Sequence, residues 1–479
     1  MIGVLSVDII NNIYKSKLLN DSVYYKIVFM IWALVHTLSF GPRITGYLSP
    51  IILLWGVLVL FRNLVLKKNI LRKSYLYIIF AFLTSYVITI IINKSLNIIG
   101  NTKTLIWAAI MLLVIFINEK SENNKKLYND IIKVSSVIVI TTFIISLISV
   151  LMFCLDISYW INRIDGALIP QGYYAARLWG IYVDPNQASS IGIVSFISSI
   201  LILCSKNYSK NYIKIFNIIN IIIQYIFIIL TGSRGGEIAF IFILIGLVYL
   251  LTDYLLKNKI KSIGTRTIIG LLCGCVISIT IIISFESTRR ILANIPRLTI
   301  STQEYISNTT GNEIGTNSGN ITVDRPDVGG GLDSSNGRLT LWRDGFRLIK
   351  YSPIFGFGDR NIVFKASQFT PGSSLEKQFV HNGFIHMLLS GGIIAVVIMI
   401  TLLILIMINI IKVVFGKNRY NKDYYLYSVM SLLVGSLLIT AVFLTEIFYQ
   451  NSFMATVFWI YRNNYRNYNI VFHIALLIF

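Results

Sequence analysis

The sequence predicts an all-α integral membrane protein with about 12 transmembrane helices (11–12) and one large extracytoplasmic loop containing a short amphipathic helix. Three observations predict this fold class. Hydrophobic residues make up 55% of the 479 positions, charged residues make up only 13%, and the mean hydropathy is +0.71. Long apolar runs recur along the chain, and cations alternate between the segments that join them. A water-soluble fold of this length cannot bury so much apolar surface.

The individual spans follow from the length of each apolar run, since a spanning helix needs about 20 mostly apolar residues. In chain order the candidate spans are 24–40, 45–62, 75–92, 104–118, 131–155, 188–204, 213–231, 237–255, 266–285, 383–414, 424–444 and 447–461. The last two require a tight turn at Glu446. We therefore expect a membrane domain over 1–285, a large loop over 286–380 and C-terminal spans over 381–479.

The cations orient these spans. With a cytoplasmic N-terminus, the inner segments carry 25 Lys and Arg residues and the short outer loops carry 6. Cytoplasmic loops are enriched in Lys and Arg, so the asymmetry places the large loop outside the plasma (inner) membrane.

The type of cation also differs between the two sides. On the inner side 19 of the 25 cations are lysines, whereas on the outer side 12 of 17 are arginines. Lysine suffices to hold loops at an anionic membrane face, but arginine grips phosphate or carboxylate with two hydrogen bonds. The outer arginines therefore favour an anionic substrate there, the alternative being that they pack the loop. The net charge of +21 needs no nucleic-acid partner.

Several function classes are disfavoured. The inner loops are short and contain no G-x-x-x-x-G-K-[ST] motif, which argues against a cytosolic catalytic domain and against ATP use. No D-x-D pair would hold a metal-bound sugar nucleotide, and the four cysteines lie in apolar runs, so we predict no metal and no cofactor. Acidic residues deep in the spans, expected in an ion-coupled carrier, are scarce. Any chemistry must therefore use a donor that is already activated and that reaches the outer face. A lipid-linked diphosphate sugar meets both conditions.

The large loop has two halves. Residues 301–337 end in a glycine-rich run, which either cradles phosphate through backbone N–H groups or serves as a linker. Residues 338–350 predict an amphipathic helix with Arg343 and Arg347 on one stripe. Arg338 begins this helix, where the helix dipole favours an anion. The alternative is a surface helix whose arginines contact lipid headgroups.

Three further positions carry candidate chemistry. His381 lies beside Asn382 just before a long span, and its ordinary pKa near 6.5 suits a general base, the alternative being a structural interfacial histidine. Arg234 lies in a short turn between two spans, and Arg177 precedes another span.

Four ordered motifs resemble the O-antigen polymerase and O-antigen ligase superfamily of bacterial surface-polysaccharide assembly. They are R-L-W-G-I-Y-V-D-P-N-Q-A (177–188), T-G-S-R-G-G (231–236), R-L-T-L-W-R-D-G-F…P-I-F-G-F-G (338–358) and H-N-G-F-I-H-M-L-L-S-G-G (381–392). The resemblance covers about 175–395 and implies a GT-C-like fold. It also implies metal-independent, inverting glycosyl transfer from an undecaprenyl-diphosphate donor at the outer face.

The resemblance implies roles for individual residues as well. Arg234 and Arg338 correspond to arginines that hold the diphosphate, and Arg177 matches its pattern more loosely. His381 corresponds to the histidine that activates the acceptor hydroxyl. We therefore expect His381 and Arg338 to be catalytic and Arg234, Arg177, Arg343 and Arg347 to bind substrate. Three acidic residues remain candidate helpers: Asp333, Asp344 and Glu376.

The predicted function is polymerisation of lipid-linked oligosaccharide repeat units in O-antigen or capsule biosynthesis. The alternatives are a ligase that moves the finished glycan to another acceptor, and a flippase that carries repeat units across the membrane. The expected partners are the undecaprenyl-diphosphate-linked oligosaccharide, the lipid bilayer, and a chain-length regulator and flippase of the same pathway.

The cation asymmetry yields a topological prediction. A cysteine introduced near Gly330 should react with an impermeant thiol reagent in intact cells, whereas one near Lys259 should not, because the two positions face opposite sides of the membrane. The unsubstituted chain, with its own cysteines, provides the background reaction. Labelling near Lys259 but not near Gly330 would reverse the orientation.

Overall fold

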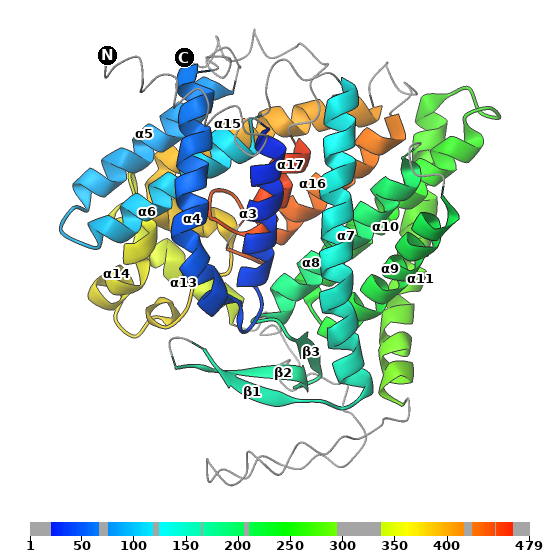
Figure 1. Ribbon diagram of the computed structural model, residues 1–479, viewed down its shortest axis with the longest axis horizontal. Helices are drawn as coiled ribbons and strands as arrows, with labels where there is room; N and C mark the ends of the chain where they lie inside the picture. The colour runs from blue at the N-terminus through cyan, green and yellow to red at the C-terminus, as the bar shows by residue number, and fades with distance from the viewer. Residues whose placement is uncertain are drawn as a thin grey trace, which may run out of the picture.

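A computed structural model describes residues 21–66, 75–117, 124–163, 166–205, 210–294, 337–415, 424–445 and 447–462. Most of these residues are helical (Figure 1). The α-helices are α3 (Ser22–His36), α4 (Gly41–Phe61), α5 (Leu76–Ile92), α6 (Ile98–Ile110), α7 (Asn124–Cys154), α8 (Pro185–Cys204), α9 (Asn211–Thr231), α10 (Arg234–Leu256), α11 (Ile263–Ala293), α13 (Arg338–Leu348), α14 (Ile362–Phe369), α15 (Gly383–Phe415), α16 (Tyr424–Thr440) and α17 (Phe453–Arg462). Short π-helical turns follow α4 (η1, Arg62–Leu66) and α6 (η3, Met111–Ile115), and 3-10 turns lie at Ile349–Tyr351, Asp359–Asn361 and Ser374–Glu376.

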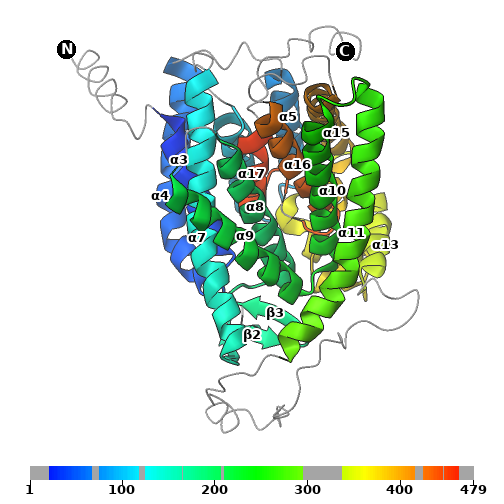
Figure 2. The same ribbon diagram turned by 90° about the vertical axis from the view of Figure 1, so that its right-hand side faces the viewer.

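The helices have the length and surface of a multi-pass membrane protein. In the described part of the chain, eight are long and apolar enough to cross a membrane, and α3, α5 and α16 are shorter apolar helices. Figure 2 shows long helices running side by side along the height of the molecule. One stripe of α11 leaves its apolar side chains 58–66% exposed: Ile268, Leu272, Val276, Ile279 and Ile283. Lipid tails can cover such a stripe, which would be costly to expose to water.

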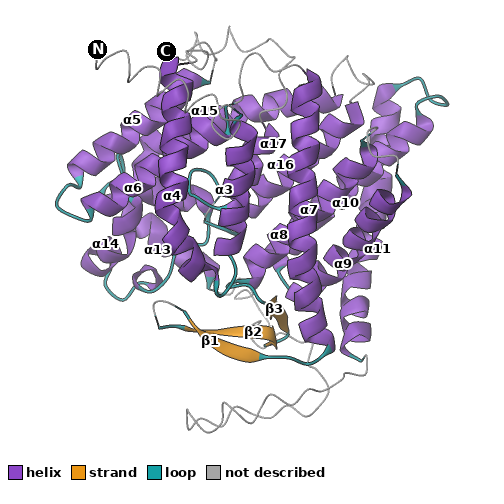
Figure 3. Cartoon of the chain, in the orientation of Figure 1, coloured by secondary structure: helices purple, strands orange, loops and turns teal. Residues whose placement is uncertain are grey.

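The mostly helical structure agrees with the all-α prediction, but a small antiparallel sheet that was not predicted interrupts the helical pattern. Its strands are β1 (Tyr159–Asn162), β2 (Leu168–Tyr174) and β3 (Arg177–Gly180), in the order β1-β2-β3. Figures 1 and 3 place this sheet at one end of the helix bundle, which we call the sheet end. The sheet was not predicted because β2 contains Pro170 and Gly172, two residue types that normally argue against a strand. The strand pairing is also irregular, since the register shifts after Gly172.

Two helices extend beyond their predicted spans. α7 begins at Asn124, whereas the predicted span begins at 131, and α11 continues to Ala293, whereas the predicted span ends at 285. Both extensions contain polar residues. The apolar run marks only the part of a helix that suits the hydrocarbon core, so it underestimates the helix length. Residues 295–336, which include the glycine-rich half of the predicted loop, lie outside the described residues.

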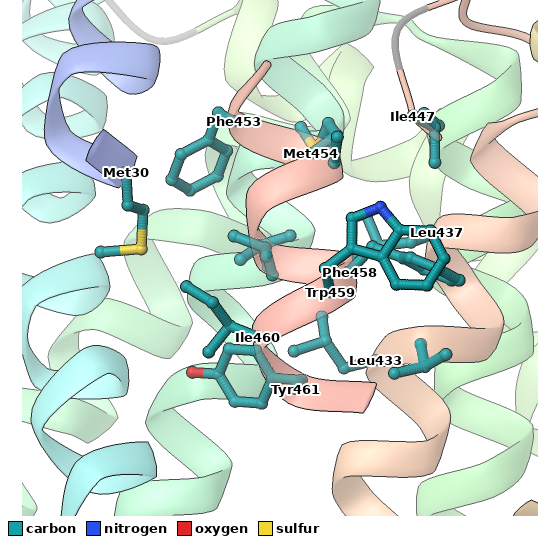
Figure 4. Packing of buried hydrophobic residues seen from close by; sticks show 14 of the residues in the cluster. Met30, Leu433, Leu437, Ile447, Phe453, Met454, Phe458, Trp459, Ile460 and Tyr461 are labelled. Carbon is teal, nitrogen blue, oxygen red and sulfur yellow. The ribbon is translucent and has the colours of Figure 1, made fainter. Parts of the chain in front are cut away.

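The predicted twelfth span over 447–461 is not confirmed. Residues 447–452 form bends, and α17 begins only at Phe453 and is ten residues long. Figure 4 shows that Phe453, Met454, Phe458 and Trp459 on α17 pack among apolar side chains of neighbouring helices. α17 is therefore a buried core helix, and its hydrophobicity reflects the protein interior. The turn predicted at Glu446 lies outside the described residues.

α15 is broken at Gly392, which has φ 70° and ψ −172°. A glycine-rich segment, 353–358, docks against this break. The N–H groups of Phe357 and Gly358 donate to the carbonyls of Leu389 and Ser390, each at 2.8 Å. In return, the N–H of Ile393 after the break donates to Pro353 O at 2.9 Å. These bonds satisfy backbone groups that the break removes from the helix, as a low-dielectric environment requires.

Two glycines make this docking possible. A Cβ at Gly392 would collide with the carbonyl of Ile354, and a Cβ at Gly356 would collide with the backbone around 389–392. Both glycines also have positive φ, which side-chain-bearing residues rarely adopt. The P-I-F-G-F-G and S-G-G motifs are therefore the two halves of one backbone contact.

The break predicts a sharp difference between two glycine substitutions. Gly392→Ala should lower the thermal unfolding temperature in detergent, because the backbone conformation alone costs about 1–3 kcal/mol for alanine and the collision with Ile354 adds to it. Gly46→Ala in α4 is the matched control, since a Cβ there meets no atom within 4 Å. Its unfolding temperature should stay unchanged or rise slightly. Equal unfolding temperatures for both variants would contradict the account of the break.

Candidate active site

A pocket lies among the segments that carry the predicted motifs. Its walls come from α6, from the start of α8, from residues 359–360, from residues 379–386 and from the α16–α17 connection between 444 and 451. That connection is non-helical, and irregular backbone at membrane depth is tolerated where it lines a cavity or is buried in protein. Of the six predicted site residues, His381 lines this pocket.

The H-N-G motif is built to present His381. Asn382 caps α15, because its side-chain oxygen accepts hydrogen bonds from the N–H groups of Phe384 and Ile385, both at 3.0 Å. The N–H of Gly383 donates to Ala441 O at 2.7 Å, which ties the helix start to the α16–α17 connection. His381 itself has φ 46°, a left-handed conformation that costs a non-glycine residue about 1–3 kcal/mol. Such strain is typical of a residue held in place by its surroundings at a functional site.

The electrostatics keep His381 neutral near pH 7. Burial lowers the pKa of His381 below its usual value, Asp184 opposes this shift by raising it, and Arg338 lowers it further. A neutral imidazole is the form that accepts a proton. The environment of His381 therefore suits a general base.

Arg338 stands at the first position of α13, after Gly337 in a left-handed conformation. Its guanidinium lies over the ring of Phe443, 5.4 Å from the centroid, a cation–π geometry. A Cβ on Gly235, the neighbour of Arg234, would press against the same ring. Phe443 therefore lies against both the Arg338 guanidinium and the start of α10, where Arg234 is the first residue.

The S-R-G-G turn places Arg234 at the N-terminus of α10. Gly232 ends α9 in a left-handed conformation, and the hydroxyl of Ser233 caps α10 by accepting from the N–H of Gly236 at 3.2 Å. A Cβ on Gly236 would collide with Ser189, so α10 and α8 approach closely here. Arg234 is half-buried at a helix terminus whose dipole favours anions.

Arg177 joins three elements at the sheet end. From β3 it donates to Thr231 O at 3.1 Å and to the side-chain oxygen of Asn186 at 2.8 Å. Asn186 also donates to Asp184 at 3.0 Å and accepts from Ser233 at 3.1 Å. Arg177 thus holds β3, α8 and the α9–α10 turn together, and through Asn186 it positions Asp184 beside His381.

Arg343 and Arg347 lie elsewhere on α13. Both are exposed, and neither lines the pocket. Arg347 approaches Asp344 at 3.6 Å, but its side chain is 64% exposed, so this ion pair contributes little. The predicted helper Asp344 accepts from the N–H of Ser374 at 3.0 Å.

The other two predicted helpers lie outside the pocket wall or outside the described residues. Glu376 accepts a hydrogen bond from the N–H of Gly372 at 2.5 Å, so its carboxylate stabilises the backbone of its own loop. Asp333 lies outside the described residues.

The sequence analysis missed an ionisable pair in the pocket wall. Asp359 and His386 both line the pocket, and Asp359 Oδ1 lies 2.6 Å from His386 Nε2. His386 was visible in the fourth motif, but it was assigned to the following span. No spacing rule links it to Asp359, because the break at Gly392 brings the two segments together.

Part of the pocket wall, including His381, belongs to a segment that matches a known protein family. Residues 219–400 match the family model described as O-antigen ligase. This segment of the chain is therefore similar to the O-antigen ligase family. This match confirms the resemblance to the O-antigen polymerase and ligase superfamily of glycosyl-transfer enzymes. The matched segment includes Arg234, Arg338 and His381, whereas the pattern containing Arg177 precedes it. No curated protein matches the chain significantly.

The contacts of Arg177 and Arg343 predict different effects of a conservative change. Arg177→Lys should destabilise the protein by about 1–3 kcal/mol, since one ammonium cannot replace both guanidinium hydrogen bonds. Arg343→Lys, at an exposed position of the matched segment, should stay within about 0.5 kcal/mol of the parent. Thermal unfolding in detergent measures both. An Arg177→Lys protein of parental stability but without activity would indicate direct substrate contact instead.

Proposed function

We propose that the chain is a polymerase of undecaprenyl-diphosphate-linked oligosaccharide repeat units in surface-polysaccharide biosynthesis. It acts by metal-independent, inverting glycosyl transfer at the outer face of the plasma membrane, so the sheet end is extracytoplasmic. The observation that carries the proposal is the position of His381. It lies in the pocket wall, within the segment similar to the O-antigen ligase family, under the electrostatic influence of Arg338 and Asp184.

The arginines supply the donor side of the proposed reaction. Arg338 and Arg234 begin two helices whose N-termini both lie beside the ring of Phe443, one through the Arg338 guanidinium and the other through Gly235. A diphosphate placed there gains two guanidinium charges and two favourable helix dipoles. The negative charge grows on the leaving diphosphate as the reaction proceeds, so these groups bind the transition state more tightly than the ground state.

The acceptor side uses His381. A hydroxyl of the acceptor sugar attacks the anomeric carbon of the donor sugar from the face opposite the diphosphate. The new carbon–oxygen bond forms as the bond to the diphosphate breaks, and undecaprenyl diphosphate leaves. His381 takes the hydroxyl proton, so atoms and charge balance without a metal. Paired carboxylates, as in glycosidases, are not required.

Two alternatives remain as named outcomes of the experiment. A ligase would bind the donor diphosphate with the same arginines and use the same base, and would differ only in the acceptor. A flippase would move repeat units across the membrane without transferring them.

The role of His381 predicts a strong loss of product. His381→Ala should reduce turnover about 10²–10⁴-fold, the usual contribution of a general base. Because burial lowers the pKa of His381, the wild-type rate should fall as the pH decreases and the base becomes protonated, with the midpoint below the usual histidine range. His36→Ala is the matched control, since His36 bonds Thr45 between α3 and α4 and does not line the pocket.

The intermediates that accumulate in cells carrying His381→Ala distinguish the candidates. Single repeat units exposed on the outer leaflet support the polymerase. Long chains retained on the lipid carrier would favour the ligase, and repeat units confined to the cytoplasmic leaflet would favour the flippase. Normal polymer from this variant, at normal protein level, would remove His381 as the base.

A further inference from the structure

We propose that the Asp359–His386 pair binds the acceptor sugar, with His386 Nδ1 forming a hydrogen bond with one of its hydroxyl groups and Asp359 fixing the orientation of the imidazole. This inference rests on the proposed function, because it takes the pocket beside His381 as the acceptor site. It adds a hydroxyl-bearing sugar as the ligand, and it names the two residues that select its position.

The geometry of the pair fixes which ring nitrogen faces a ligand. His386 Nε2 lies 2.6 Å from Asp359 Oδ1, and the two side chains are only 3% and 11% exposed. An ionised carboxylate accepts hydrogen bonds and donates none, so Nε2 carries the proton. Nδ1 is then the ring nitrogen left for a ligand, where it can form a hydrogen bond with a hydroxyl group, and no partner for Nδ1 is found among the described residues.

Asp359 is held firmly enough to impose this tautomer. Its backbone N–H donates to the hydroxyl of Tyr86 at 3.1 Å, and its Oδ2 accepts from Thr104 at 3.3 Å. Burial raises the pKa of Asp359, but the hydrogen bond and charge of His386 and the charge of Arg360 lower it by more, so the net shift is downward. The carboxylate therefore stays ionised, an arrangement like the aspartate that orients a catalytic histidine.

The rest of the pocket wall suits a sugar. Polar side chains that both donate and accept, including Gln450 and Asn451, line it together with the aromatic rings of Trp107 and Phe379. The side-chain oxygen of Gln450 is buried without a hydrogen-bond partner among the described residues. A buried acceptor of this kind requires a donor, and a sugar hydroxyl provides one. Few but well-placed polar groups beside apolar surface are typical of a small-molecule site.

The two histidines lie in the same pocket on different parts of the chain. His381 precedes α15 in a left-handed conformation, whereas His386 lies within the helix. A sugar in the pocket meets both side chains. One histidine can therefore hold a neighbouring hydroxyl while the other takes the proton of the attacking hydroxyl, which makes His386 a binding residue and Asp359 a positioning residue.

The test uses the purified full-length protein in detergent with lipid-linked repeat units extracted from polymerase-deficient cells. His386→Phe keeps a ring but removes both of its nitrogens. It should raise KM for the repeat unit about ten- to hundredfold, the loss expected for one hydrogen bond to a polarised partner, while kcat falls much less than in His381→Ala. His386→Gln, whose amide can donate to Asp359 and accept from a hydroxyl, should recover part of the loss.

A control separates binding from folding. Asp253→Asn removes a buried carboxylate that lies 3.5 Å from Arg266, away from the pocket. It should lower thermal stability without changing KM. Asp359→Asn should raise KM, by less than His386→Phe, because the amide oxygen can still accept from Nε2.

The outcomes separate this inference from the proposed function. An unchanged KM in His386→Phe, together with lost turnover in His381→Ala, would overturn the inference alone. Equal loss of kcat in both histidine variants at constant KM would also overturn it, because His386 would then share the proton transfer. Full turnover in His381→Ala would overturn the proposed function first.

Discussion

The candidate site depends on the contact between the break in α15 and segment 353–358. A helix interrupted inside a membrane protein leaves N–H and C=O groups that lipid cannot satisfy. Here the opposing segment satisfies them through four backbone hydrogen bonds, the fourth from Ile394 to Ile354 at 3.4 Å. Because Asp359 directly follows Gly358 in the chain, the same contact places Asp359 beside His386. Backbone chemistry therefore fixes a side-chain pair that lies 27 residues apart in sequence.

A second network fixes the opposite wall of the pocket. Hydrogen bonds of Arg177 join β3, the start of α8 and the α9–α10 turn. Asn186, one of its partners, in turn forms hydrogen bonds with Asp184 and Ser233. Asp184 lies close enough to His381 to raise its pKa against the effect of burial. Arginine is well suited to this position, because its fork makes two hydrogen bonds in fixed directions. The arginine-rich outer composition thus includes at least one residue, Arg177, whose hydrogen bonds join structural elements.

The membrane spans were predictable because they depend on one local quantity, the length of an apolar run. The four ordered motifs, which carry Arg234, Arg338 and His381, indicated the resemblance from the sequence alone. The family match over 219–400 confirms that resemblance. The sheet was missed because Pro170 and Gly172 disguise β2. The span predicted over 447–461 is not confirmed, since a buried core helix such as α17 and a lipid-facing helix have similar hydrophobicity.

The Asp359–His386 pair was missed for a different reason. Asp359 directly follows the third motif and His386 lies within the fourth, and the break at Gly392 brings the two segments together. Non-local contacts of this kind have no period and no spacing in the sequence. Sequence reasoning therefore found His381, whereas the tertiary structure was needed to pair Asp359 with His386.

A structure of the protein with a bound lipid-linked repeat unit tests the central claim most directly. The account predicts that the diphosphate lies between Arg234 and Arg338, with the donor sugar directed toward His381. A diphosphate bound at the end of the bundle opposite the sheet, or away from these arginines, would contradict it.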